Sequence, residues 1–142
     1  MENKKRERKT GGNQQKPRQW KVLLVDEDFQ YLRSQALILR RHGLDVLPCD
    51  SYSEGMVRLD SEHFDLVIVS QGSLGFEGRT VLEHASETGS CAPVVVVAPH
   101  ADIPCYLEAM NLGAADYLEQ PLDEPDVEKM KVRFLEAITG NA

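Results

Sequence analysis

The chain has 142 residues, of which 42% are hydrophobic, and its formal net charge is −7 at pH 7. This length supports one hydrophobic core of ordinary size, so we expect a single domain. The sequence has no apolar run long enough to span a membrane and no signal-peptide pattern, which predicts a cytoplasmic protein with no membrane partner. Its three cysteines lack the spacing of a disulfide framework or a zinc site, so we expect reduced thiols at Cys49, Cys91 and Cys105.

Charge is distributed unevenly along the chain. Residues 1–20 carry seven Lys and Arg side chains against two Glu, a net charge of +5, whereas the rest of the chain carries 9 basic and 21 acidic side chains, a net charge of −12. The absence of apolar periodicity at the start predicts a disordered basic tail (1–20) before a folded domain (21–140). Nucleic-acid association would have to involve this tail, because an acidic domain repels phosphates; a merely solubilising tail is an equally good interpretation.

From Lys21 onward, apolar runs of strand length alternate with patterns of helical spacing. Strands are predicted at 22–25, 44–47, 66–69, 94–98 and 117–118, and a helix is predicted after each. The residues that the helices are expected to bury are, in chain order, Phe29, Leu32, Ala36 and Leu39; Met56 and Leu59; Val81, Leu82 and Ala85; Ile103, Leu107 and Met110; and Val127, Met130, Phe134 and Ile138.

Residues that favour helix ends support these assignments. Gly43 is suited to ending the first helix, and residues 51–54 have the spacing of a capping box at the start of the second. Asp123 is a good N-cap for the last helix, with Pro125 tolerated in its first turn. Five βα units in succession therefore predict an α/β fold, with a doubly wound parallel sheet and right-handed crossovers.

Polar residues follow several of the predicted strands. The carboxyl ends of parallel strands share one edge of the sheet, and the ligand crevice of an open α/β sheet lies there. The first strand brings residues 26–28 (Asp-Glu-Asp) to this edge, the third brings Ser70, the fourth is followed by 99–100 (Pro-His), and the fifth by 119–121 (Glu-Gln-Pro). We therefore expect any site to lie at this edge.

Over residues 21–138, the sequence resembles the receiver domain of bacterial two-component response regulators. The resemblance rests on LLVDED at the first strand, GFEG after the third, PVVVVAPHAD at the fourth and GAADYLEQPL around the fifth. It implies a flavodoxin-like (βα)5 fold with strand order 2-1-3-4-5. It also implies a role in phosphorelay signalling, with a histidine kinase or another signalling protein as partner. Because no output domain follows the last helix, we expect a stand-alone adaptor.

The resemblance also implies a degenerate phosphorylation site. In the family, an aspartate after the third strand accepts a phosphoryl group, an acidic pair holds Mg²⁺, and a hydroxyl residue and a lysine complete the site. Asp26 and Glu27 match the acidic pair, whereas Ser70 stands at the acceptor position, Ala98 at that of the hydroxyl residue and Gln120 at that of the lysine. We expect no phosphorylation on aspartate, weak Mg²⁺ binding or none, no other cofactor, and no enzymatic activity.

Tyr117 matches the family's aromatic residue on the fifth strand, which moves inward with the hydroxyl residue on the fourth strand when the domain is phosphorylated. Because Ala98 has no hydroxyl, this coupling is expected to be broken, and Tyr117 is equally well read as a tyrosine at the edge of the core. The resemblance implies a partner-binding face on the fourth helix, fifth strand and fifth helix, with a homodimer as an alternative occupant. Its residues would be Ile103, Tyr106, Met110, Tyr117 and Leu118.

Further alternatives stay open at this point. The domain could be an active regulator that binds Mg²⁺ at its acidic residues and is phosphorylated at an unusual acceptor such as Ser70. An esterase-like Ser-His-Asp site would need Ser70, His100 and Asp26 together. The local sequence VSQG lacks the G-x-S-x-G elbow that exposes a catalytic serine, which disfavours the esterase.

Overall fold

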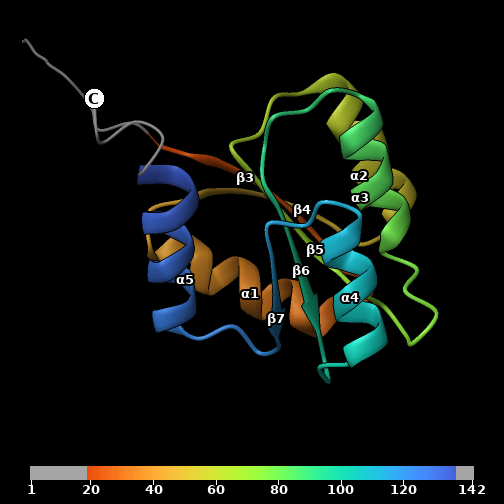
Figure 1. Ribbon diagram of the computed structural model, residues 1–142. Helices are drawn as coiled ribbons and strands as arrows, with labels where there is room; N and C mark the ends of the chain where they lie inside the picture. The colour runs from red at the N-terminus through yellow and green to blue at the C-terminus, as the bar shows by residue number, and fades with distance from the viewer. Residues whose placement is uncertain (1–18, 137–142) are drawn as a thin grey trace, which may run out of the picture.

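A five-stranded parallel sheet forms the centre of the domain. In the computed structural model, which describes residues 19–136, the strands are β3 (Lys21–Val25), β4 (Asp45–Cys49), β5 (Leu66–Ser70), β6 (Val94–Ala98) and β7 (Asp116–Glu119) (Figure 1). They lie in the order β4-β3-β5-β6-β7, and all neighbouring strands pair in parallel. This is the predicted 2-1-3-4-5 order, and the strand ends differ from the predicted ones by at most two residues.

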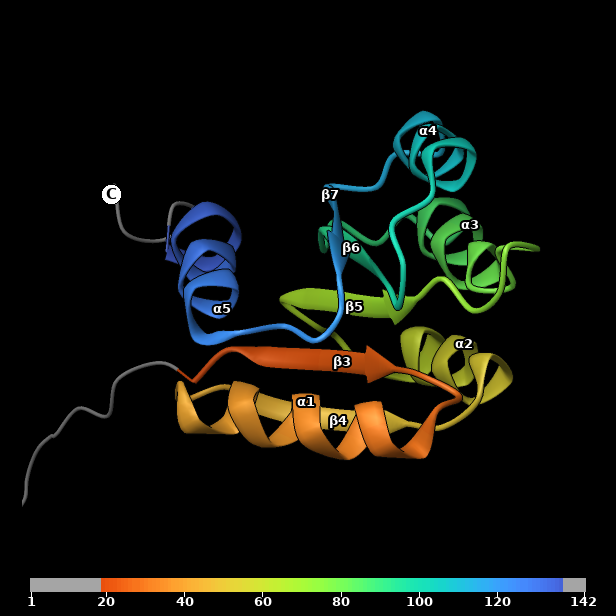
Figure 2. The ribbon, with the colours of Figure 1, turned by 90° about the horizontal axis from the view of Figure 1, so that it is seen from below.

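Helices cover both faces of this sheet. They are α1 (Phe29–Arg41), α2 (Tyr52–Ser61), α3 (Arg79–Glu87), α4 (Ile103–Asn111) and α5 (Glu124–Met130). One cluster of buried side chains lies under α1 and α5, and another under α2, α3 and α4; Figure 2 shows the two groups of helices on opposite sides of the strands. The doubly wound arrangement is thus confirmed, and it explains why every residue of β5 and β6 is buried.

The predicted caps are confirmed, and helix burial follows the prediction in part. Ser51 Oγ accepts a hydrogen bond from Glu54 N–H, and Asp123 forms a capping box with Asp126. Met56 and Leu59 of α2 are half-buried against the core. The predicted residues of α1 and α3 are fully buried except for one at the start of α1; those buried are Leu32, Ala36, Leu39, Val81, Leu82 and Ala85.

The predicted burial is wrong at the start of α1 and along α4. Phe29 is the first residue of α1, and its side chain is 59% exposed. On α4, Ile103 and Leu107 are 74% and 54% exposed, and Met110 is exposed as well. Two small residues, Cys105 and Ala109, face the core there instead. The large apolar residues of α4 do have helical spacing, but they form a solvent-facing surface. The opposite face of the helix carries small side chains, which allow it to lie close to the sheet.

The chain continues from α5 into a π-helical turn, Lys131–Glu136. Val127 and Met130 are buried as predicted, but Leu135 is buried in place of Phe134, which is only half-buried. The i to i+5 hydrogen bonding of a π-helix moves the buried face by one residue relative to an α-helix. Ile138, the last residue predicted for this helix, lies outside the described residues.

Trp20, one residue before the predicted start of the folded domain, contacts that domain. Trp20 packs against the cluster under α1 and α5, and its carbonyl accepts a hydrogen bond from Asp45 N–H (2.8 Å). The rest of the predicted basic tail, residues 1–18, lies outside the described residues. None of the helices in the described part of the chain is long and apolar enough to cross a membrane.

The three cysteines are free thiols, as predicted. Burial raises the pKa of Cys49 to about 11 and that of Cys105 to about 11, so both remain protonated at neutral pH.

Candidate functional site

The carboxyl ends of β3 and β5 and the segments after β6 and β7 border an acidic hollow of about 360 Å³. The sequence-predicted residues that line it are Asp26, Glu27, Asp28, Ser70, Pro99 and Gln120. Glu77, from the loop between β5 and α3, adds another carboxylate. The structure therefore brings the polar residues that follow separate strands to one place, at the edge where the sequence predicted a site.

Ser70 is the last residue of β5, and only 4% of it is exposed. Its Oγ accepts a hydrogen bond from Gly72 N–H (3.2 Å), and its carbonyl accepts one from the hydroxyl of Tyr52 (3.1 Å). His100 is exposed and does not line the hollow, so the Ser-His-Asp arrangement that an esterase needs is not assembled. The serine hydroxyl serves as an acceptor for the loop that follows it.

Close packing fixes that loop. Gly78 N–H donates to the carbonyl of Gln71 (3.0 Å), and a Cβ added to Gly78 would lie 1.9 Å from the carbonyl oxygen of Ser70. Only glycine fits such an approach. Phe76 has a φ of 54°, in the left-handed region, and its ring is buried in the core under α2, α3 and α4. Burial of the ring stabilises a backbone conformation that a bulky residue rarely adopts.

Asp26 is buried and accepts two hydrogen bonds. Its Oδ1 accepts from Asp28 N–H and its Oδ2 from Gln120 Nε2, both at 2.9 Å. Burial raises the pKa of Asp26 above its ordinary value, while the hydrogen bonds from Asp28 and Gln120 oppose that shift in part. Gln120 thus offers the carboxylate a neutral amide, which hydrogen-bonds it without compensating its charge.

Gln35 extends this network into α1, and the sequence reading did not single it out. Gln120 Nε2 also donates to Gln35 Oε1 (3.1 Å), and Gln35 is buried. Gln35 Nε2 and Gln120 Oε1 are buried with no hydrogen-bond partner. The sequence held a signal for Gln35: it lies one position before Ala36 and three after Leu32, on the face of α1 predicted to be buried.

The residues around Asp26 do not fit a magnesium site. Mg²⁺ needs near-octahedral oxygen coordination, and in the family a carboxylate after the third strand supplies part of it. Ser70, the last residue of β5, offers no carboxylate, and each oxygen of Asp26 already accepts a hydrogen bond from a protein group. Within residues 19–136, no group of three His, Cys, Asp or Glu side chains is placed to hold a metal ion.

Glu77 is committed to its own loop. Its Oε1 accepts from Ser73 N–H and its Oε2 from the Ser73 hydroxyl, both at 2.7 Å. These hydrogen bonds lower the pKa of Glu77, which therefore stays ionised at neutral pH. Glu77 adds negative charge to the rim of the hollow and closes the loop from 73 to 77.

Tyr117 and its neighbours lie beyond the hollow, next to α4. The Tyr117 hydroxyl donates to Gln71 Oε1 and accepts from Asp102 N–H (3.1 Å). Its ring meets that of Tyr106 edge to face, with 5.7 Å between the centroids. Ala98 is fully buried in β6. Leu118 packs with the cluster under α1 and α5, so it points to the opposite face of β7 from Tyr117.

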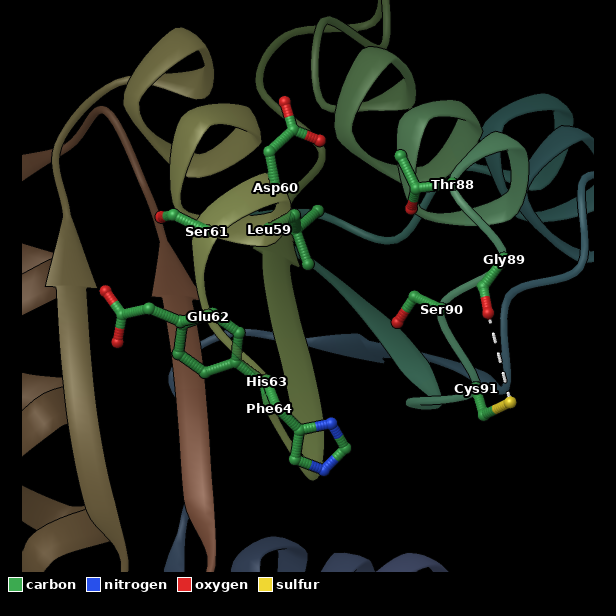
Figure 3. Close-up of a pocket in the computed structure, with 10 residues that line it drawn as sticks. All are labelled: Leu59, Asp60, Ser61, Glu62, His63, Phe64, Thr88, Gly89, Ser90 and Cys91. Carbon is green, nitrogen blue, oxygen red and sulfur yellow. Dashed lines mark hydrogen bonds between the residues drawn. The ribbon is translucent and has the colours of Figure 1, made fainter.

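A larger hollow, of about 520 Å³, lies at the other end of β5, between the segments before β5 and before β6. Figure 3 shows its lining, residues 59–64 and 88–91. Two of its acidic side chains form ion pairs: Asp60 with His84 (2.8 Å) and Glu62 with Lys21 (2.6 Å). It contains none of the residues that the sequence predicted for a site or a partner-binding face.

Comparison with known families identifies the family to which this domain belongs. The family model for the response regulator receiver domain matches residues 22–131. The chain belongs to this family. Receiver domains are signalling modules of two-component systems that interact with histidine kinases and other proteins, so the resemblance seen in the sequence is confirmed at this level.

Relatives with known names agree with this assignment. The transcriptional regulatory protein FixJ of Azorhizobium caulinodans is 32% identical over 111 residues, covering 76% of this chain and 51% of FixJ. The transcriptional regulatory protein ZraR of Escherichia coli K12 is 26% identical over 102 residues, covering 72% of this chain and 23% of ZraR. The chain thus spans about half of the first relative and less than a quarter of the second.

The solved structures support the predicted flavodoxin-like fold. The CheY-like response regulator receiver domain protein from Methanospirillum hungatei JF-1 has a TM-score of 0.75 and 27% sequence identity. The match covers 84% of this chain and 96% of that one.

Substituting Asp26 by asparagine is expected to stabilise this receiver domain at neutral pH. Because folding raises the pKa of Asp26, the unfolded chain loses this proton at lower pH than the folded domain. Ionisation of Asp26 therefore opposes folding increasingly as pH rises through the range between the two pKa values. Rotation of the Gln120 and Gln35 side-chain amides together would let Gln120 Oε1 accept from the new amide and from Gln35 Nε2. We expect Asp26→Asn to raise the melting temperature at pH 7.5 by a few degrees.

Thermal unfolding followed by circular dichroism at pH 7.5 and near pH 4 measures this effect. The gain is expected to shrink at the lower pH, because the raised pKa of Asp26 lets the folded wild type bind this proton as the pH falls. Asp50→Asn, at an exposed position, is the matched control and should leave the melting temperature unchanged. A lower melting temperature for Asp26→Asn at pH 7.5 would contradict the account of this site.

Proposed function

We propose that this receiver domain is a protein-interaction module whose signalling does not depend on phosphorylation of an aspartate. The observation that carries the proposal is the identity and environment of the residue at the end of β5. Ser70 is a buried serine that accepts a hydrogen bond from Gly72 N–H, not a carboxylate open to a phosphodonor. A serine hydroxyl needs a general base to become a nucleophile, and the hydrogen bonds of this site provide none.

Gln120 and the acidic residues of the hollow also disfavour phosphoryl transfer. Phosphoryl transfer requires that developing charge be neutralised by a cation, normally Mg²⁺ and a lysine in this family. Gln120 supplies a neutral amide, and its Nε2 is already engaged by Asp26 and Gln35. With Asp26, Glu27, Asp28 and Glu77 around it, the hollow would repel an incoming phosphoryl group.

We further propose that partners bind the face formed by α4, β7 and α5. On α4, Ile103, Tyr106 and Met110 are exposed, and Leu107 extends the same surface. Several exposed large apolar side chains on one short helix are typical of an interaction surface. Tyr117 and Leu118, on the edge strand β7, are partly buried and support this face from within. The occupant is a signalling protein, with a second copy of the chain as the alternative.

Intact mass after incubation with acetyl phosphate and Mg²⁺ tests the first proposal. In a working receiver, the carboxylate oxygen forms a bond to phosphorus while the bond to the acetate oxygen breaks and acetate leaves. We expect no phosphoryl adduct on the wild-type chain. The double variant Ser70→Asp with Gln120→Lys, which restores the carboxylate and the cation, is expected to gain one phosphoryl group, at least in part.

Ser70→Ala is the control for modification of the serine itself. A stoichiometric adduct on the wild type that Ser70→Ala abolishes would instead establish an active regulator with an unusual acceptor.

Alanine substitutions on α4 test the proposed face. Tyr106→Ala and Met110→Ala remove exposed apolar area, and we expect each to weaken partner binding or self-association about tenfold, as central contacts of an interface do. Val57→Ala, which removes a side chain of similar exposure from α2, is the matched control. Sedimentation velocity measures self-association, and affinity capture with quantitation measures partners. Unchanged binding for both α4 variants would exclude this face.

Nucleic-acid association through residues 1–20 stays an alternative prediction, and residues 1–18 of that segment lie outside the described residues. It requires salt-dependent binding that is lost when the tail is deleted.

A further inference from the structure

We propose that Gln71 is a latch that holds Tyr117, and through it the start of α4, in a single conformation without any phosphoryl group. The inference rests on the proposed function, because it explains how the face on α4 stays in a binding-competent arrangement. It concerns a residue that has no part in phosphoryl chemistry.

The main chain on both sides of Gln71 is fixed, and so is its amide. Gln71 N–H donates to Val97 O (2.7 Å), which ties it to β6, and its carbonyl accepts from Gly78 N–H (3.0 Å). Its side chain is 98% buried, and Nε2 donates to the carbonyl of Ser73 (3.2 Å). A carbonyl oxygen only accepts, so the amide nitrogen must face Ser73 and Oε1 must face the other way.

That second direction leads to Tyr117. Its hydroxyl accepts from Asp102 N–H, so its one proton is free to be donated to Gln71 Oε1. The result is a directed chain of hydrogen bonds from Asp102 through Tyr117 and Gln71 to Ser73. It joins three segments that are far apart in sequence: the start of α4, strand β7 and the loop after β5.

The first donor of this chain of hydrogen bonds, the Asp102 N–H, lies where α4 begins. Asp102 is the N-cap of α4, and its Oδ2 accepts from Cys105 N–H (3.0 Å). A tyrosine that holds the backbone of the N-cap therefore sets where the helix starts. The ring of Tyr117 also supports the exposed ring of Tyr106, edge to face. Displacement of Tyr117 would disturb the N-cap and the surface together.

The side chain at position 98 has no part in this link. Ala98 is fully buried and has no hydroxyl with which to attract or release Tyr117. Gln71, next to Ser70 in the chain, bonds to Tyr117 directly. Because Nε2 of Gln71 donates to Ser73 O while Oε1 accepts from Tyr117, one orientation of the amide satisfies both partners, and a reversed amide would lose both hydrogen bonds. The arrangement therefore has one stable state and not two.

Hydrogen exchange of the Asp102 amide, measured by NMR on the full chain, tests the latch. Tyr117→Phe keeps the ring and removes the acceptor of this amide, and Gln71→Leu removes the acceptor of the tyrosine proton. We expect each variant to accelerate exchange at Asp102 by roughly tenfold, the effect of losing one part-buried hydrogen bond. Tyr106→Phe, which alters only the exposed ring of the pair, is the matched control and should leave this rate unchanged.

A second measurement uses the unaltered protein, so the test does not depend on variants that fold. The hydroxyl proton of Tyr117 is expected to exchange slowly enough to be seen and to give a nuclear Overhauser contact to the Gln71 amide. Exchange at Asp102 within twofold of wild type in both variants would overturn the latch, and so would a Tyr117 hydroxyl that exchanges as fast as that of Tyr106.

These outcomes are distinguishable from those of the phosphorylation experiment. Failure of the latch with no phosphoryl adduct on the wild type removes the latch and leaves the interaction module standing. A phosphoryl adduct on the wild type overturns the proposed function, whatever the exchange rate at Asp102.

Discussion

A buried carboxylate that no cation compensates, as far as residues 19–136 are concerned, is the constraint on which the site depends. Asp26 is held at the end of β3 by hydrogen bonds from Asp28 N–H and from Gln120. We propose that Gln120 and Ser70 stand at the positions where an intact receiver site has a lysine and an aspartate. On this proposal, one negative and one positive charge are absent together, so the pocket keeps a charge balance that the fold tolerates.

Most of the fold could be predicted from the sequence because two periodicities carry it. Apolar runs of four or five residues, such as 66–69 and 94–98, are typical of strands buried on both faces, and their alternation with helical spacing fixed the class of fold. The wrong predictions of burial occur on helices where the spacing of apolar residues does not show which face packs against the sheet. On α4, exposed Ile103 and Leu107 had the spacing of a core face, while Cys105 and Ala109 gave too weak a signal.

The sequence predicted which residues lie at the site, but it did not predict the hydrogen bonds among them. Asp26, Ser70 and Gln120 were brought together at one edge by the topology alone. Gln35 and Gln71 were not singled out, because a single glutamine in an apolar pattern carries no signature of its partner. Their roles depend on which donors and acceptors lie near them in space, and that follows from the packing of α1, β5 and β7.

Beryllofluoride, which mimics a phosphoryl group on aspartate, offers the most direct test of the claim that this pocket neither receives such a group nor transmits its arrival. Amide chemical shifts of the full chain would be recorded while Mg²⁺ and then beryllofluoride are added. The account predicts no saturable shift at residues 26–28 or 70–73, and none along α4. A saturable shift in the pocket that spreads to Asp102 and Tyr106 would contradict it, because such a response is that of a receiver that still switches.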